Sequence, residues 1–173
     1  AGLIAGLRGK ALLKTMGRGI ADVAPGIILI LLAVSVKYIM SESGTIDTLM
    51  YYAADRITRA GQGAASLGMY LVVLVLNFFI GSASAKAFLV MPVLAPLADL
   101  CNLTRQTAVL AFAFGDGYSN VFFPTNAVLL IALGLAGVGY GKWFKFTWLL
   151  QLVTLALTAG LLLLATAIGL GPY

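Results

Sequence analysis

Long stretches without a charged residue constrain this chain most strongly. Five such stretches exceed ten residues, and they cover residues 23–36, 60–85, 87–98, 117–141 and 146–173. A helix needs about 20 mostly apolar residues to cross the hydrocarbon core of a bilayer. Of the 173 residues, 61% are apolar and 10% are charged, whereas soluble domains carry roughly 45–50% and about 25%. The sequence therefore predicts an all-α integral membrane protein and excludes a soluble domain, a disordered segment and a disulfide scaffold.

The spacing of charges and turn residues divides the single membrane domain, residues 1–173, into segments. Residues 1–18 separate apolar from basic side chains, which predicts a helix in the headgroup region, with a plain connector as the alternative. Residues 46–60 have the pattern of an amphipathic surface helix. Two uninterrupted spans are expected, at 23–40 and 147–170.

Two further apolar segments are interrupted by small and polar residues. In 66–98, the apolar arms flank the sequence GSASAK, and the first arm, 66–80, is about 22 Å long at the helical rise. Arms shorter than the bilayer core predict a re-entrant hairpin, with a single span broken in its middle as the alternative. In 104–137, the sequence GDGYSNVFFPTN interrupts the apolar run, and its glycines and proline disfavour a continuous helix. This second segment is predicted to be a discontinuous helix.

The number of Lys and Arg residues on each side of the membrane distinguishes the re-entrant hairpin from the broken span. With a re-entrant hairpin, about three spans cross, and six cations (Arg8, Lys10, Lys14, Arg18, Lys142, Lys145) face four (Lys37, Arg56, Arg59, Arg105). With a broken span the count is five against five. Because cytoplasmic segments carry an excess of Lys and Arg, the hairpin is favoured. This predicts a multi-pass protein of the cell inner membrane with its N-terminus in the cytoplasm and its C-terminus outside.

Lys86 and Asp116 are isolated charges in apolar surroundings. Asp116 lies eleven residues after Arg105 and twenty-six before Lys142, so it should lie deep in the bilayer. A charge exposed to lipid at that depth is costly, so each side chain should face a cavity or a partner. We expect Lys86 to bind a substrate carboxylate and Asp116 to hold a coupling cation, sodium or a proton. A structural ion pair is the alternative, and both interpretations hold if Asp116 neutralises Lys86 in the empty site.

The two interruptions are the main indication of function. Backbone at membrane depth must be hydrogen-bonded internally, so a break occurs only where it lines a cavity or packs on protein. A pair of broken segments is typical of the binding site of a secondary transporter, because helix ends aim N–H groups at anions and carbonyls at cations. Polar side chains are dense there, namely Ser82, Ser84, Ser119, Asn120, Thr125 and Asn126. Ordinary kinks, with hydroxyls bonded to their own helix, are the alternative.

Other residue types narrow the function further. Asn77 lies just before the first interruption and either caps it or bonds a neighbouring helix. The chain has no histidine and one cysteine, Cys101, so zinc sites and histidine-based catalysis are not expected. We therefore expect no resident cofactor and no enzymatic activity. The cations lie at the ends of apolar runs instead of among aromatic residues, so no nucleic-acid partner is expected.

Several motifs resemble a known transporter family. SASAKA, RQTAVLAF, GDG-x-SN and PTN are similar to the C-terminal half of YfcC-type carriers, which are grouped with the C4-dicarboxylate anaerobic carriers of the ion transporter superfamily. The resemblance implies two inverted halves, each contributing one hairpin and one unwound helix to a central site. It implies a hairpin tip of Ser82, Ala83, Ser84 and Lys86, and an unwound segment that contains Gly115, Asp116, Gly117, Ser119, Asn120, Thr125 and Asn126. Dicarboxylates and basic amino acids both stay open as substrates.

The chain has no internal repeat, so the resemblance covers one inverted-repeat half. We expect a fragment whose N-terminal half is missing, and the alternatives are one chain of a two-chain transporter and an antiparallel homodimer with a second copy. The expected partners are the lipid bilayer and a small-molecule substrate. The leading function is a cation-coupled carrier of small carboxylates or amino acids. A non-transporting membrane scaffold and a channel are the alternatives.

Overall fold

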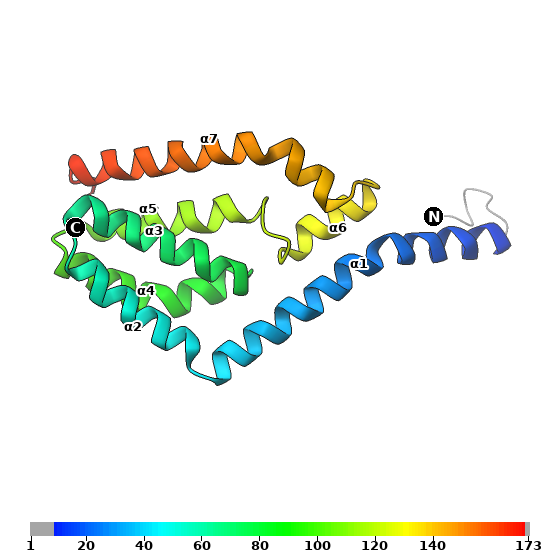
Figure 1. Cartoon of the computed structure of the whole chain (residues 1–173), viewed down its shortest axis with the longest axis horizontal. Helices are drawn as coiled ribbons and strands as arrows, with labels where there is room; N and C mark the ends of the chain where they lie inside the picture. The colour runs from blue at the N-terminus through cyan, green and yellow to red at the C-terminus, as the bar shows by residue number, and fades with distance from the viewer. Residues whose placement is uncertain (1–8, 172–173) are drawn as a thin grey trace.

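The structure, a computed structural model, describes residues 9–171 as seven α-helices joined by short connections (Figure 1). No strand occurs among these residues. The predicted all-α architecture is therefore confirmed. The helices α3, α4, α5 and α7 form an elongated bundle with α2 beside α3 and α4, and α1 runs from α2 past α6 and away from the bundle (Figure 1).

The first helix is longer than the sequence predicts. α1 (Gly9–Glu42) is one continuous helix that includes the described part of the predicted headgroup helix at 1–18 and the whole predicted span at 23–40; residues 1–8 lie outside the described residues. Glycines and Pro25 lower the helix propensity between the two segments. In an apolar medium, however, a break leaves backbone groups unpaired, which costs more than poor propensity. The helix therefore continues through this region.

The second helix is amphipathic. α2 (Thr45–Thr58) follows Gly44, whose φ of 65° suits glycine and allows the sharp turn after α1. Ile46, Met50 and Ile57 are buried on one face of α2 at helical spacing. Charged side chains such as Asp47 and Arg56 are exposed on α2. The helix covers most of the stretch 46–60, and its place at the membrane surface stays a prediction.

The third and fourth helices are antiparallel neighbours. α3 (Gln62–Phe79) and α4 (Ala83–Leu100) are joined by a short turn, and Figure 1 shows this turn at the level where α5 ends. The Gln62 side-chain amide donates to the carbonyl of Asn102 at 2.7 Å. The beginning of α3 and the end of α4 therefore lie at the same end of the bundle, and α4 does not continue α3 in line. At 18 residues, each helix is about 27 Å long, longer than the predicted arms.

The predicted discontinuous helix has a shorter break than expected. α5 (Arg105–Ser119) ends before residues 120–126, and α6 (Ala127–Leu135) follows. The resemblance implies that the unwound segment includes Gly115, Asp116, Gly117 and Ser119, but these four residues lie in the last turns of α5. The Ser119 hydroxyl donates to the Gly115 carbonyl at 2.8 Å, and the Asn120 amide donates to the Asp116 carbonyl at 2.9 Å. These bonds satisfy carbonyls at the helix end, which keeps the glycines helical.

The last helix exposes many large apolar side chains. α7 (Tyr140–Ala167) follows Gly137, a left-handed glycine with φ of 66° that ends α6. Among the described helices, α3, α4 and α7 are long and apolar enough to cross a membrane. Large apolar side chains such as Phe146, Leu149 and Leu164 point away from the bundle. A surface of this kind fits contact with lipid.

The core is built around α3. Ala65, Met69, Val73 and Leu76 are completely buried along one face of this helix. α3 packs against α5, α4 and α7, so it is the central helix of the bundle. The end of α3 thus lies inside the protein, which places polar side chains there away from lipid.

Candidate functional site

A buried ion pair joins α4 to α5. Lys86, in the first turn of α4, has no solvent-accessible surface, and its Nζ lies 2.7 Å from Oδ1 of Asp116. Lys86 Nζ also donates to Oδ1 of Asn77 on α3. The lysine therefore links three helices. A buried charge is tolerated when it is paired and hydrogen-bonded, and Lys86 meets both conditions.

Asn77 connects the ion pair to the end of α5. While its Oδ1 accepts from Lys86, its Nδ2 donates to the hydroxyl of Ser119 and to the Asp116 carbonyl. Asn77 and Ser119 are both buried. We refer to Asn77, Lys86, Asp116 and Ser119 as the polar cluster. The Asp116 side chain is 15% exposed, although its Oδ1, which contacts Lys86, is buried, so only another part of this side chain reaches the surface.

The turn between α3 and α4 lies beside the polar cluster in sequence and is open to solvent. Ser82 is the N-cap of α4, and its hydroxyl accepts from the Ala85 backbone N–H at 3.4 Å. Ser82, Ala83 and Ser84 are all exposed. The first N–H groups of α4 have no intrahelical acceptors, so this end of the helix can bind an anion.

The break between α5 and α6 is ordered by side-chain amides. Asn126 is the N-cap of α6 and accepts from the Leu129 N–H at 3.1 Å, while its Nδ2 donates to Asn120 Oδ1 at 2.8 Å. Phe123 in the break packs edge-on against Phe78 near the end of α3, with ring centroids 5.5 Å apart. The break and the α3–α4 turn are therefore brought together by the aromatic contact as well as by the ion pair.

Two side chains at the start of α7 hold the backbone of the break. The Tyr140 hydroxyl donates to the Phe122 carbonyl at 2.7 Å, and Trp143 Nε1 donates to the Val121 carbonyl at 3.1 Å. These carbonyls have no helical partner, and such groups must be satisfied at membrane depth. The sequence analysis missed this role for Tyr140. An aromatic donor shortly after a proline-containing break was the available signal.

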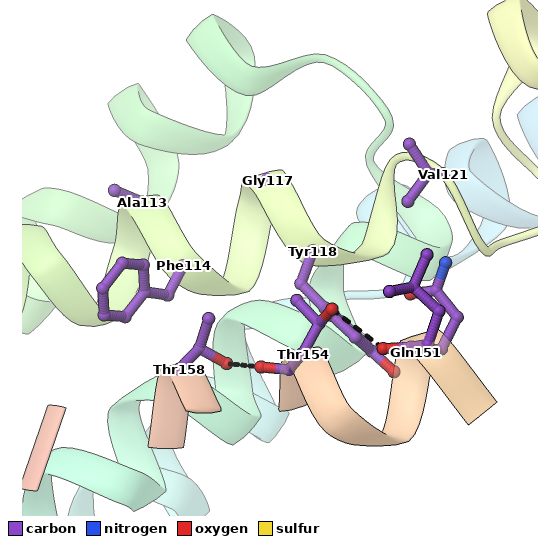
Figure 2. A pocket seen from close by; sticks show the side chains of 9 residues that line it. Ala113, Phe114, Gly117, Tyr118, Val121, Gln151, Thr154 and Thr158 are labelled. Carbon is purple, nitrogen blue, oxygen red and sulfur yellow. Dashed lines mark hydrogen bonds between the residues drawn. The ribbon is translucent and has the colours of Figure 1, made fainter. Parts of the chain in front are cut away.

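A pocket of about 310 Å³ lies between α5 and α7 (Figure 2). Its walls are formed by Ala113, Phe114, Gly117, Tyr118, Val121, Leu150, Gln151, Thr154 and Thr158. At about 100° per residue, Gly117 and Tyr118 lie on the opposite side of α5 from Asp116 and Ser119. The pocket is therefore separate from the polar cluster, and the predicted site residue Gly117 faces the pocket.

The structure brings together only part of the predicted site. Four predicted residues form the polar cluster, and Gly115 packs directly beneath it against α3. Asn120 and Asn126 bond each other in the break, whereas no hydrogen bond links the Ser84 or Thr125 hydroxyl to another described residue. Among the described side chains, no three or more acidic, cysteine or histidine residues lie close enough together to hold a metal ion. The roles of these residues toward a substrate or an ion stay predictions.

Comparisons with known proteins agree with the interpretation of this chain as part of a carrier. No solved structure matches the chain. The chain is 40% identical over 104 residues to a protein of Escherichia coli (strain K12) named "Putative basic amino acid antiporter YfcC", with 60% of this chain and 21% of the relative covered. It is 26% identical over 167 residues to an uncharacterized protein of Haemophilus influenzae, with 96% of this chain and 32% of the relative covered. The chain thus spans about a fifth to a third of the length of these relatives.

A family match covers nearly the whole chain. Residues 1–167 match the family described as "C4-dicarboxylate anaerobic carrier". This confirms the resemblance that the SASAKA, GDG-x-SN and PTN motifs suggest, and it agrees with the absence of an enzymatic role. The chain therefore belongs to the C4-dicarboxylate anaerobic carrier family.

Proposed function

We propose that this chain forms one inverted half of a cation-coupled secondary transporter for small carboxylates or amino acids. The ion pair between Lys86 and Asp116 carries this proposal. It lies where the α3–α4 turn meets the α5–α6 break, and both elements are interruptions of helices. Intramembrane charges mark substrate and ion pathways in transporters. Membership of a carrier family supports the same conclusion.

The α3–α4 turn and the break supply the groups that bind the substrate. Lys86 pairs with a substrate carboxylate, and the exposed hydroxyls of Ser82 and Ser84 add hydrogen bonds beside the free N–H groups of α4, with Ala83 at the same tip. Asn120, Thr125 and Asn126 contact the substrate from the break. Helix N-termini favour negative charge. The exposure of the tip leaves these groups free to meet a ligand.

Asp116 holds the coupling ion, sodium or a proton, together with Asn77; the carbonyls of Gly115 and Gly117, expected from the sequence to join them, would do so only if the end of α5 unwinds. A dicarboxylate brings two negative charges to a cluster with one cation, and this favours amino acids. The relative named as a basic amino acid antiporter agrees with that preference.

The α3–α4 pair enters the bilayer and returns on the same side, while α1, the α5–α6 segment and α7 cross it. The position of the turn supports this topology, because the turn lies at the level where α5 ends (Figure 1) and is tied there to Asp116. The missing N-terminal half, or an antiparallel second copy, provides the opposing hairpin and break. The protein lies in the cell inner membrane with its N-terminus in the cytoplasm.

Uptake into liposomes tests the function. The intact assembly, with the N-terminal half or the second copy present, is reconstituted and offered radioactive dicarboxylates and amino acids, with sodium and proton gradients imposed separately. Asp116→Asn should abolish uptake, and Lys86→Gln should raise the half-saturation concentration of an anionic substrate. A membrane scaffold would show no uptake in any form. A channel would show flux that neither saturates nor depends on the gradient, and either result contradicts the proposal.

A further inference from the structure

The ammonium group of Lys86 lies on oxygen atoms that a coupling cation would use. Its Nζ is 2.7 Å from Asp116 Oδ1 and donates to Asn77 Oδ1. Carboxylate and amide oxygens are typical ligands of hard cations. The same atoms cannot hold an ammonium group and a metal ion at once, since two cations at this distance repel each other strongly in a buried site.

We infer that Lys86 is a built-in competitor of the coupling cation. Its ammonium group occupies the cation position while the site is empty, and sodium enters only after Lys86 has turned away. The inference rests on the proposed function, in which a substrate carboxylate attracts Lys86. It adds the order of events, because the anion removes the lysine and the departure of the lysine opens the cation position.

Charge balance explains why the two binding events are coupled. With Lys86 on Asp116, the buried pair is neutral. With Lys86 on a substrate carboxylate and sodium on Asp116, both positions are neutral again. If Lys86 leaves and no sodium enters, Asp116 becomes an uncompensated buried charge, which is strongly unfavourable. The anion and the cation therefore raise each other's affinity, as linkage requires.

The surroundings of the pair allow this exchange. Lys86 lies in the first turn of α4, four residues after the exposed Ser82, and its four-carbon stem gives the ammonium group reach toward the tip. The Asp116 side chain is 15% exposed although its Oδ1 is buried, so an ion approaches Oδ1 through the exposed part of this side chain. Asn77 stays in place when Lys86 leaves, because its Nδ2 is held by Ser119 on α5.

Sodium binding without substrate tests the inference. The purified full chain is equilibrated with radioactive sodium as the wild type, Lys86→Met, Lys86→Arg and the double variant Lys86→Met/Asp116→Asn. Lys86→Met should bind sodium at least about tenfold more tightly than the wild type, since a site filled by lysine most of the time lowers the apparent affinity by the occupied fraction. Lys86→Arg keeps a cation and should resemble the wild type. Equal binding by the wild type and Lys86→Met, or by Lys86→Met and the double variant, overturns the inference.

Thermal unfolding provides a second measurement that controls for folding. Sodium chloride should raise the melting temperature of Lys86→Met above its value in N-methylglucamine chloride, because a ligand that binds only the folded state stabilises it. The wild type and the double variant should show no such difference. Lys86→Gln is used in the same way if Lys86→Met does not fold. If neither variant folds in the presence of sodium, the inference fails, because sodium then does not replace the ammonium group. No substrate enters either experiment, so failure of the transport proposal is seen separately in the uptake assay.

Discussion

Gly115 of α5 lies directly against Val73 of α3. A Cβ atom at position 115 would be 2.8 Å from both Cβ and Cγ1 of Val73 and 3.2 Å from the Tyr70 carbonyl oxygen. These neighbours are a branched side chain near its backbone and a backbone oxygen, so they cannot move aside easily. The missing side chain of Gly115 therefore sets how closely α5 approaches α3, and hence where Asp116 meets Lys86 and Asn77.

Gly115→Ala should separate α5 from α3. Overpacking of this kind costs about 1–3 kcal/mol, and we expect a lower melting temperature and weaker sodium binding in the Lys86→Met background. Gly117→Ala is the matched control, because no atom lies within 4 Å of a Cβ at that position and alanine favours a helix by up to about 1 kcal/mol. Equal melting temperatures for the two variants would contradict the packing role of Gly115.

The Lys86–Asp116 pair should show strong coupling in a double-mutant cycle. Lys86→Met and Asp116→Asn each leave one partner without its counter-charge, which costs about 3–5 kcal/mol for a buried pair. The double variant removes both charges and should lose much less stability than the sum of the two. The free energy of unfolding, measured by denaturant titration in detergent without sodium, checks this. Additive losses would show that the two charges do not interact.

Tyr140→Phe should weaken the break between α5 and α6. The change removes the donor to the Phe122 carbonyl, and an unsatisfied buried carbonyl costs about 1–3 kcal/mol. The exposed Tyr51 provides the control, since the same change there removes a hydroxyl on the surface. Proteolysis and hydrogen exchange of residues 120–126 should become faster only in Tyr140→Phe. If the protection of residues 120–126 is unchanged in Tyr140→Phe, other contacts hold the break in place.

Cysteine labelling should report the proposed topology. Cysteines at Gly61 and Leu100 should react with a membrane-impermeant maleimide from one side, and a cysteine at Gly139 from the other. A cysteine at Ser84 should be protected from a large maleimide on both sides, because the turn ends within the bilayer. Labelling of Ser84→Cys from the side that labels Gly139→Cys would show that α3 and α4 cross completely.

The native Cys101 should contribute little background to this labelling at neutral pH. Burial raises the pKa of the Cys101 thiol above its usual value, and the thiolate is the reactive form. The thiol therefore stays protonated at neutral pH, and its reaction rate should increase as the pH is raised past the ordinary pKa of a cysteine. Stopped-flow labelling of the wild type across this pH range checks the direction, and a rate already at its maximum at neutral pH would contradict it.

The central ion pair could be anticipated from the sequence because Lys86 and Asp116 are isolated charges in apolar surroundings. Each charge needs a partner at membrane depth. Lys86 is the charge at the interruption of 66–98 and Asp116 is the charge at the interruption of 104–137, so each is the expected partner of the other. Pro124 likewise marks the break, since proline lacks the N–H that a helix requires. These predictions rest on the free-energy costs of an unpaired charge at membrane depth and of proline inside a helix, and both costs hold in any fold.

The end of α5 could not be placed in the same way. Gly115 and Gly117 suggested unwinding, but the bonds that Ser119 and Asn120 make to nearby carbonyls keep the last turns helical. Intrinsic propensity does not include such side-chain caps. The role of Tyr140 was hidden for a related reason, because its acceptor at Phe122 lies 18 residues away and depends on how α7 folds back.

The bonds from Tyr140 and Trp143 to the break have a consequence for the host membrane. The uncharged part of α7, residues 146–167, is about 33 Å long, close to the thickness of a typical hydrocarbon core, so a thinner bilayer should increase the tilt of this helix. Tilting displaces the first turn of α7 and the two donors that it carries. The thickness of the bilayer therefore affects the geometry around Asn120 and Asn126. Lipids of different chain length should change this geometry.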